Sequence, residues 1–216
     1  MSTGPDIMQT LRIQPITQPL SRRGFVMAAA ATAVLTLAAC SPEAASFQSV
    51  DITGANFAKN LRLTDHLGQT RTLGDFKGKI VVIFFGFTQC PDVCPTSMTT
   101  MAEVKRLLGE RGDLLQVLFI TVDPERDTLP LLKDYMAAFD PSFLALRPEP
   151  AELKTVAADF KVYFKKVDGK TPTSYTMDHS AGKYIFDTTG SARLYSNYGT
   201  EASVIAADIE TLLKSR

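Results

Sequence analysis

Apolar residues along this chain of 216 residues follow two patterns. The run over residues 80–85 is continuously apolar, as is typical of a central strand that is covered on both faces, and the mostly apolar run over residues 114–122 predicts a second buried strand. Elsewhere the apolar residues recur at helical spacing, and Pro95 suits the first turn of a helix because its missing N–H costs nothing there. These segments predict helices over residues 95–108, 129–139, 150–165 and 201–214.

The remaining segments predict short strands and turns. We expect a first strand over residues 57–63, a turn over 65–68 and a turn-rich stretch over 72–79. Residues 183–186 and 193–196 flank a turn sequence and read as a hairpin. Strands that alternate with helices, followed by a hairpin and a last helix, predict an α/β sandwich with a mixed central sheet flanked by helices.

The N-terminus has the pattern of an export signal. Arg22 and Arg23 precede an apolar stretch over residues 26–39, which is shorter than the roughly 20 residues of a membrane-spanning helix. The arginine pair resembles a twin-arginine signal, although ordinary Sec signals also carry such pairs. Leu37-Ala38-Ala39-Cys40 resembles a lipobox, in which cleavage leaves a lipid on the sulfur of Cys40. An uncleaved anchor is the alternative.

This segment divides the chain into three parts. We expect an export signal over residues 1–39, a tether over 40–49 and one folded domain over 50–216. The domain would lie on the periplasmic side of the membrane, attached through the lipid. The chain has 23 basic and 23 acidic residues and no concentrated basic face, which argues against nucleic-acid binding.

Two cysteines are the most informative residues of the domain. Cys90 and Cys94 lie in Gly86-Phe87-Thr88-Gln89-Cys90-Pro91-Asp92-Val93-Cys94-Pro95, directly after the first apolar run. Cysteines at the carboxyl end of a central strand and the start of a helix favour a thioredoxin-like arrangement. The helix N-terminus there favours the thiolate, the form that attacks disulfides and binds soft metals. A purely structural disulfide is less attractive, because so short a loop restrains little of the unfolded chain.

A histidine extends this pair to three ligands. His179 lies in a predicted loop before the strand at residue 183, at the same sheet edge as the cysteines if the fold is thioredoxin-like. Two thiolates and an imidazole suit copper, with Zn(II) as the main competitor, but structural zinc sites usually have four protein ligands. His66, in a polar turn, is interpreted as an exposed loop residue.

At this point the sequence resembles the Sco/SenC family. The resemblance covers residues 50–215 and rests on the cysteine motif, on Thr121-Val122-Asp123-Pro124-Glu125-Arg126-Asp127-Thr128 and on Asp178-His179-Ser180. It implies a thioredoxin fold that binds copper, as Cu(I) or Cu(II), through Cys90, Cys94 and His179. It also implies a role in assembling the binuclear copper centre of cytochrome c oxidase subunit II, by copper delivery, by reduction of target cysteines, or by both. A copper donor or a thiol reductant would be a further partner. Many relatives have a membrane helix where this chain has a lipoprotein-like signal.

Two other functions remain open. Cys90 and Cys94 could serve as the redox pair of a thiol–disulfide oxidoreductase acting on exported proteins, so enzymatic activity beside the metallochaperone role is left undecided. A peroxidase of the same fold is less favoured, since no arginine is adjacent to either cysteine. In the second motif, Asp127 or Thr128 would cap the next helix. Asp123 would either form the turn or accept a hydrogen bond from a metal ligand.

Overall fold

The computed structural model describes residues 46–56, 58, 61–171 and 174–215. The chain divides into two compact units, Met1–Ala44 and Ala45–Arg216, and the described residues belong to the second. The predicted export signal and the lipid attachment at Cys40 lie outside the described residues. In the part of the chain that is described, no helix is both long enough and apolar enough to cross a membrane.

A mixed sheet of eight strands forms the centre of the domain, in the order β1-β10-β9-β4-β5-β6-β2-β3. The central strands β4, β5 and β6 run parallel, while β9 pairs with β4 in the antiparallel direction. The strands are β1 (Val50–Asp51), β2 (Arg62–Asp65), β3 (Thr70–Thr72), β4 (Ile80–Gly86), β5 (Leu115–Thr121), β6 (Leu144–Arg147), β9 (Lys183–Phe186) and β10 (Ala192–Ser196).

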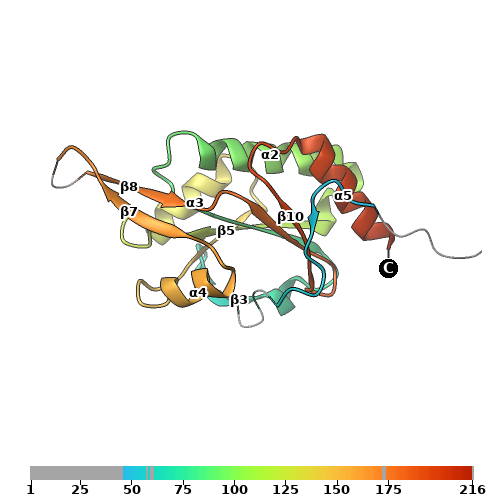
Figure 1. The fold of residues 1–216 in the computed structure, drawn as a ribbon, viewed down its shortest axis with the longest axis horizontal. Helices are drawn as coiled ribbons and strands as arrows, with labels where there is room; N and C mark the ends of the chain where they lie inside the picture. The colour runs from blue at the N-terminus through green and yellow to red at the C-terminus, as the bar shows by residue number, and fades with distance from the viewer. Residues whose placement is uncertain (1–45, 57, 59–60, 172–173, 216) are drawn as a thin grey trace, which may run out of the picture. The chain divides into compact units, whose positions relative to one another are not determined.

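Helices cover both faces of this sheet. Figure 1 shows α2 (Val93–Leu107) and α5 (Ala202–Lys214) side by side on one face and α4 (Leu153–Asp159) on the other. The ring of Tyr135, from α3 (Leu129–Ala137), packs on Phe119 of β5, and short 3-10 helices η2 (Leu73–Phe76) and η3 (Gly109–Leu114) precede β4 and β5. This is the predicted α/β sandwich with a thioredoxin-like arrangement.

Strands β4 and β5 form the middle of the core. All seven residues of each strand are buried, as predicted for two strands covered on both faces, and in β5 this includes the polar residues Gln116 and Thr121. The strands pair in register from Ile80 with Leu115 to Gly86 with Thr121. Their carboxyl ends therefore stop at the same edge of the sheet, where the cysteine loop and the Asp123 loop begin.

A separate two-stranded ribbon carries the histidine. It consists of β7 (Phe164–Asp168) and β8 (Tyr175–His179), paired antiparallel with Phe164 opposite His179, and it extends away from the main sheet in Figure 1. The prediction of a helix over residues 150–165 is wrong at its end, and His179 ends a strand rather than lying in a loop. Lys161, with a φ of 54°, ends the helical path after Asp159, and the chain is extended again as β7 from Phe164.

Two further corrections concern the sheet. The predicted first strand over residues 57–63 is instead β2, which begins at Arg62 and includes Asp65, and the short strand β6 was not predicted. Strand β6 holds only four residues, too few to show a period of their own. The hairpin of β9 and β10, the helix α3 and the terminal helix α5 are confirmed, as is the cap of α3, where Thr128 Oγ1 accepts from Leu131 N at 3.4 Å.

Candidate metal centre

Cys94 sits on α2 against the end of β4. Its side chain is fully buried, and the absence of a side chain at Gly86 makes room for it, since a β-carbon there would lie 2.9 Å from Cys94 Sγ. The same β-carbon would lie 2.7 Å from the Phe119 ring and 2.8 Å from the Phe84 ring. The sulfur therefore occupies a fixed position between the strand and the helix.

His179 meets this sulfur from the ribbon. Its Nε2 lies 3.5 Å from Cys94 Sγ, and its Nδ1 lies 2.9 Å from the carbonyl oxygen of Ser180. Since a carbonyl oxygen can only accept, Nδ1 carries the hydrogen and Nε2 keeps its lone pair when the ring is neutral. Burial lowers the pKa of the imidazole, which favours the neutral ring. The free lone pair therefore points at the cysteine, as a metal ligand requires.

Two aromatic rings fix the plane of the imidazole. Phe84 and Phe87 meet the His179 ring edge-on, with ring centroids 6.1 Å and 5.8 Å away. These contacts shield the ring from water and leave it little rotational freedom. The position of His179 is thus set by β4 and by the loop that carries Cys90.

Cys90 completes the set on the loop side. It is partly buried, both Cys90 and Cys94 are free thiols, and Cys90 N donates to Phe87 O at 3.3 Å. Within the described residues, no three histidine, cysteine or acidic side chains already stand where they could hold a metal ion together. Cys94 and His179 are in contact, and the Cys90 thiol is close enough to Cys94 to raise the pKa of its sulfur.

The expected stabilisation of the thiolate is not found at Cys94. Burial raises the pKa of the Cys94 thiol, and the neighbouring Cys90 thiol raises it further. The helix N-terminus was expected to have the opposite effect, but desolvation disfavours the charged form more strongly at a fully buried sulfur. At neutral pH Cys94 is therefore a thiol in the metal-free protein, and its S–H can donate to the His179 lone pair.

Arg126 joins the cysteine loop, the Asp123 loop and the ribbon. Its guanidinium forms an ion pair with Asp123, and Nη1 donates to Gln89 Oε1 at 3.1 Å and to Tyr175 O at 2.9 Å. It also stacks 3.5 Å from the centre of the Tyr175 ring, while the Tyr175 hydroxyl donates to Asp123 Oδ1 at 2.9 Å. Tyr175 begins the strand that ends at His179, so this cluster anchors the histidine strand at its far end.

The Asp123 side chain contacts the ribbon anchor and has no hydrogen bond to Cys90, Cys94 or His179 among the described residues. Its carboxylate contacts Arg126 and Tyr175, and its backbone N–H donates to the Thr121 hydroxyl at 2.9 Å. The structure places it at the ribbon anchor, and its role toward a metal ligand would pass through Tyr175. The sequence motif does not reveal that Arg126 links the cysteine loop to the ribbon, because its partners Gln89 and Tyr175 lie 37 and 49 positions away.

Asp127 holds the start of the cysteine loop. Its carboxylate accepts from Thr88 N at 3.1 Å, from Thr88 Oγ1 at 2.6 Å and from Thr121 Oγ1 at 2.5 Å. Burial raises the pKa of this carboxyl. The residue is thus a buried tie between the two strand ends rather than the helix cap, and Thr128 caps the helix.

His66 and Tyr135 differ from what the sequence indicates. His66 is half-buried rather than an exposed loop residue, since its Nδ1 accepts from Ala145 N at 3.0 Å. The Tyr135 hydroxyl is buried with no hydrogen-bond partner among the described residues. Burial and the two nearby cysteines raise the pKa of that phenol. Nothing in the spacing of α3 distinguishes Tyr135 from an ordinary core residue.

The donor set fits a soft or borderline metal ion. Two ligands of one tetrahedral ion, at about 2.3 Å for sulfur and about 2.0 Å for nitrogen, lie about 3.5 Å apart. Cys94 Sγ and His179 Nε2 have that separation, 3.5 Å. Sulfur with a single imidazole favours copper, and especially Cu(I), over hard cations.

Comparisons with known proteins agree with this geometry. The family model described as SCO1/SenC matches residues 50–214. A SCO2-like protein of Rickettsia felis is 37% identical over 132 residues, which are 61% of this chain and 64% of the relative. The mitochondrial SCO2 homolog of Bos taurus is 36% identical, with 65% of this chain and 52% of the relative covered. The chain therefore spans less than two thirds of these relatives.

Solved structures give the same result over the folded domain. Bradyrhizobium japonicum ScoI with copper bound is 42% identical, with a TM-score of 0.65 over 74% of this chain and 99% of that one. Yeast Sco1 with copper bound is 31% identical, with a TM-score of 0.68 over 75% of this chain and 91% of that one.

Proposed function

This chain belongs to the SCO1/SenC family, and from that premise we propose that it binds one copper ion through Cys90, Cys94 and His179 and transfers it to a client protein. The observation that carries the proposal is the 3.5 Å contact between Cys94 Sγ and His179 Nε2, two residues 85 positions apart. Relatives with copper bound support the choice of metal.

Copper uptake involves a proton exchange at the cysteines. In the metal-free protein Cys94 is protonated and faces the His179 lone pair. A thiol must lose its proton to bind a metal, so copper binding releases protons and weakens as the pH falls. Cys90, the partly exposed sulfur, is the group that an incoming ion meets first.

A three-ligand site also suits release. Copper held by two sulfurs and one nitrogen leaves room for a ligand from the client, so the ion can pass through a shared intermediate rather than through water. We propose cytochrome c oxidase subunit II as the client, with a copper donor upstream. BsSco, which shares the fold, is described as a member of the Sco family of cytochrome c oxidase assembly proteins.

Reduction of client disulfides is the second candidate function. Cys94 lies in the first turn of α2 and Cys90 in the loop before it, both as free thiols, and Cys90 is accessible enough to attack a disulfide. The Cys90 thiolate would displace one client sulfur and form a mixed disulfide. Cys94 would then attack Cys90, releasing the second client sulfur as a thiol and leaving a Cys90–Cys94 disulfide, so two electrons pass to the client.

The proposed location is the periplasmic side of the membrane. Residues 1–39 would direct export and be removed, Cys40 would carry the lipid, and residues 40–49 would tether the domain of residues 50–216. A Bacillus anthracis protein of the same fold is described as a SCO1/SenC family lipoprotein.

Copper titration of the reduced domain tests the proposal. We expect one copper ion per chain, with sulfur-to-copper charge-transfer absorption in the Cu(II) form and loss of both retention and absorption in Cys90→Ser. Reduction of an oxidised dithiol peptide is measured on the same samples. Rapid reduction by a domain that binds no copper would replace the carrier function by the reductase function.

A further inference from the structure

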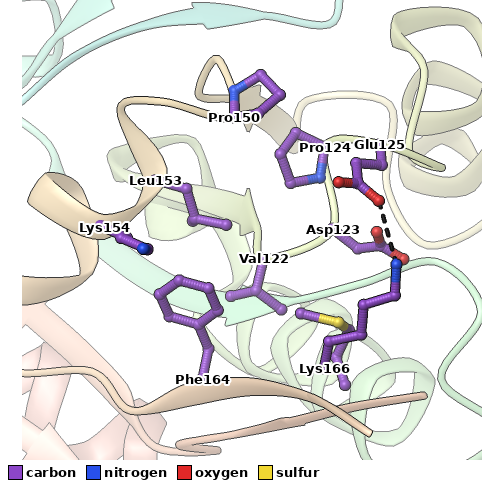
Figure 2. A pocket seen from close by; sticks show the side chains of 10 residues that line it. Val122, Asp123, Pro124, Glu125, Pro150, Leu153, Lys154, Phe164 and Lys166 are labelled. Atoms are coloured by element: carbon purple, nitrogen blue, oxygen red, sulfur yellow. Dashed lines mark hydrogen bonds and ion pairs between the residues drawn. The ribbon is translucent and has the colours of Figure 1, made fainter. Parts of the chain in front are cut away.

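An apolar pocket of about 190 Å³ lies under the ribbon, beside the end of β5. Figure 2 shows Phe164 from the ribbon facing Leu153 of α4 across the pocket, with Val122 at its floor. Val122 is 1% exposed and Leu153 is 6% exposed, so the pocket reaches into the core. An apolar cavity of roughly 150 Å³ accommodates a benzene molecule, so this one has room for a single leucine, methionine or phenylalanine side chain.

The pocket shares its walls with the metal centre. Val122 N donates to Gly86 O at 2.8 Å, and Gly86 is the residue against which Cys94 Sγ packs. On the other wall, Phe164 is the register partner of His179. Cross-strand partners lie about 5 Å apart, so a group in the pocket that touches Phe164 is one residue from His179, and on the Val122 side Gly86 separates it from Cys94.

Two acids and two lysines line the pocket, and Lys154 carries its unpaired charge. Asp123 is paired with Arg126, whereas Lys154 is exposed and forms no ion pair in the described part of the chain. Lys166 pairs with Glu125 at 3.4 Å across the opening, as the dashed line in Figure 2 marks. Both of these side chains are largely exposed, 48% and 65%, and an exposed pair contributes at most about 1 kcal/mol, so an incoming carboxylate can replace Glu125.

We propose that this pocket docks an extended, acidic segment of the client, with one apolar side chain inserted and a neighbouring carboxylate on Lys154 or Lys166. The inference rests on the proposed function, because it names the segment that brings client cysteines to Cys90. An apolar anchor supplies the affinity, while the lysines select acidic segments. Since strands advance about 3.3 Å per residue, client cysteines a few residues from the anchor reach the metal centre.

Disulfide tethering tests the docking directly. In Cys94→Ser, which cannot eject a bound thiol, the Cys90 thiol exchanges with short peptides whose single cysteine is supplied as its mixed disulfide with 2-mercaptoethanol, so that 2-mercaptoethanol leaves as the thiol and the peptide stays on Cys90. The first peptide has a leucine and flanking glutamates, the second has serine in place of the leucine, and the third has lysines in place of the glutamates. The 2-mercaptoethanol concentration that releases half of each peptide is measured.

We expect the leucine–glutamate peptide to need about tenfold more reductant than the serine peptide, the worth of burying one large side chain. Lys154→Glu should lower that resistance about fivefold and raise that of the lysine peptide. Leu153→Phe, which fills the pocket, should remove the difference between leucine and serine. Lys77→Glu, an equal charge change at an exposed site before β4, should leave every peptide unchanged.

Equal release of the leucine and serine peptides would overturn the docking proposal, and so would equal effects of Lys154→Glu and Lys77→Glu. Copper titration of Lys154→Glu separates this failure from failure of the proposed function. Normal copper binding with no peptide selectivity refutes the pocket alone, whereas absence of copper binding in the unaltered chain refutes the carrier function whatever the peptides do.

Discussion

Replacement of Gly86 by alanine is the sharpest structural perturbation of the metal centre. The new β-carbon would lie 2.9 Å from Cys94 Sγ, 2.7 Å from the Phe119 ring and 2.8 Å from the Phe84 ring. Ordinary carbon contacts are about 3.5 to 4.0 Å, so all three neighbours must move by close to 1 Å. None of them has free space, since Cys94, Phe84 and Phe119 are each 0% exposed.

Overpacking a core by one methyl group typically costs about 1–3 kcal/mol. Three simultaneous overlaps on a strand paired on both sides place Gly86→Ala at the upper end, near 3 kcal/mol. The Cys94 sulfur is displaced from a position 3.5 Å from His179 Nε2, so copper affinity should also fall. We expect the Cu(II) charge-transfer band to shift, because its energy depends on the copper–sulfur geometry.

Urea unfolding and copper titration of the same samples measure both effects. Gly74→Ala is the matched control, since its β-carbon meets only the Thr72 hydroxyl at 3.4 Å, and we expect less than about 1 kcal/mol of change there. If Gly86→Ala unfolds at the same urea concentration as the unaltered domain and keeps its Cu(II) spectrum, the reasoning about the sulfur position is wrong.

Two further predictions concern buried charge. Arg126→Met leaves the Asp123 carboxylate, which is 3% exposed, without its cation. The free energy of unfolding in urea should fall by about 3 kcal/mol, and copper binding should weaken because the ribbon loses its anchor. Full stability of this variant would contradict the anchoring role of Arg126. Lys183 is 1% exposed, and burial lowers its pKa from 10.5 to about 8. Between pH 8 and 10.5 the unfolded chain binds more protons than the folded one, so the free energy of unfolding should rise with pH by on the order of 3 kcal/mol. Lys183→Met should remove this rise. Parallel pH curves for the two proteins would show that Lys183 does not titrate in this way.

Strands β4 and β5 were predictable from sequence because they are covered on both faces, whereas the four-residue β6 was not. The apolar runs at β4 and β5 and the turn between β9 and β10 carry their own local signals, and each was located to within one or two residues. The cysteine motif and His179 were also recognisable, since thiols and imidazole form a small set of ligands with a definite chemistry.

The ribbon and its anchor were not predictable in the same way. Residues 164–168 follow a helix with no turn signal except the left-handed Lys161, so the helical pattern was extended too far. Arg126 gains its role from Gln89 and Tyr175, which are remote in sequence. The ionisation of Cys94 also depends on burial, and a helix N-terminus alone gave the wrong direction for its pKa.

Copper titration of His179→Ala beside the unaltered domain tests the central claim most directly. Imidazole is a harder ligand than thiolate, so its loss should weaken Cu(II) binding by a larger factor than Cu(I) binding and should alter the charge-transfer spectrum. His66→Ala is the matched control, because that ring is half-buried at a distant turn and should change neither. Unchanged Cu(II) affinity and spectrum in His179→Ala would remove His179 from the site and contradict the three-ligand account.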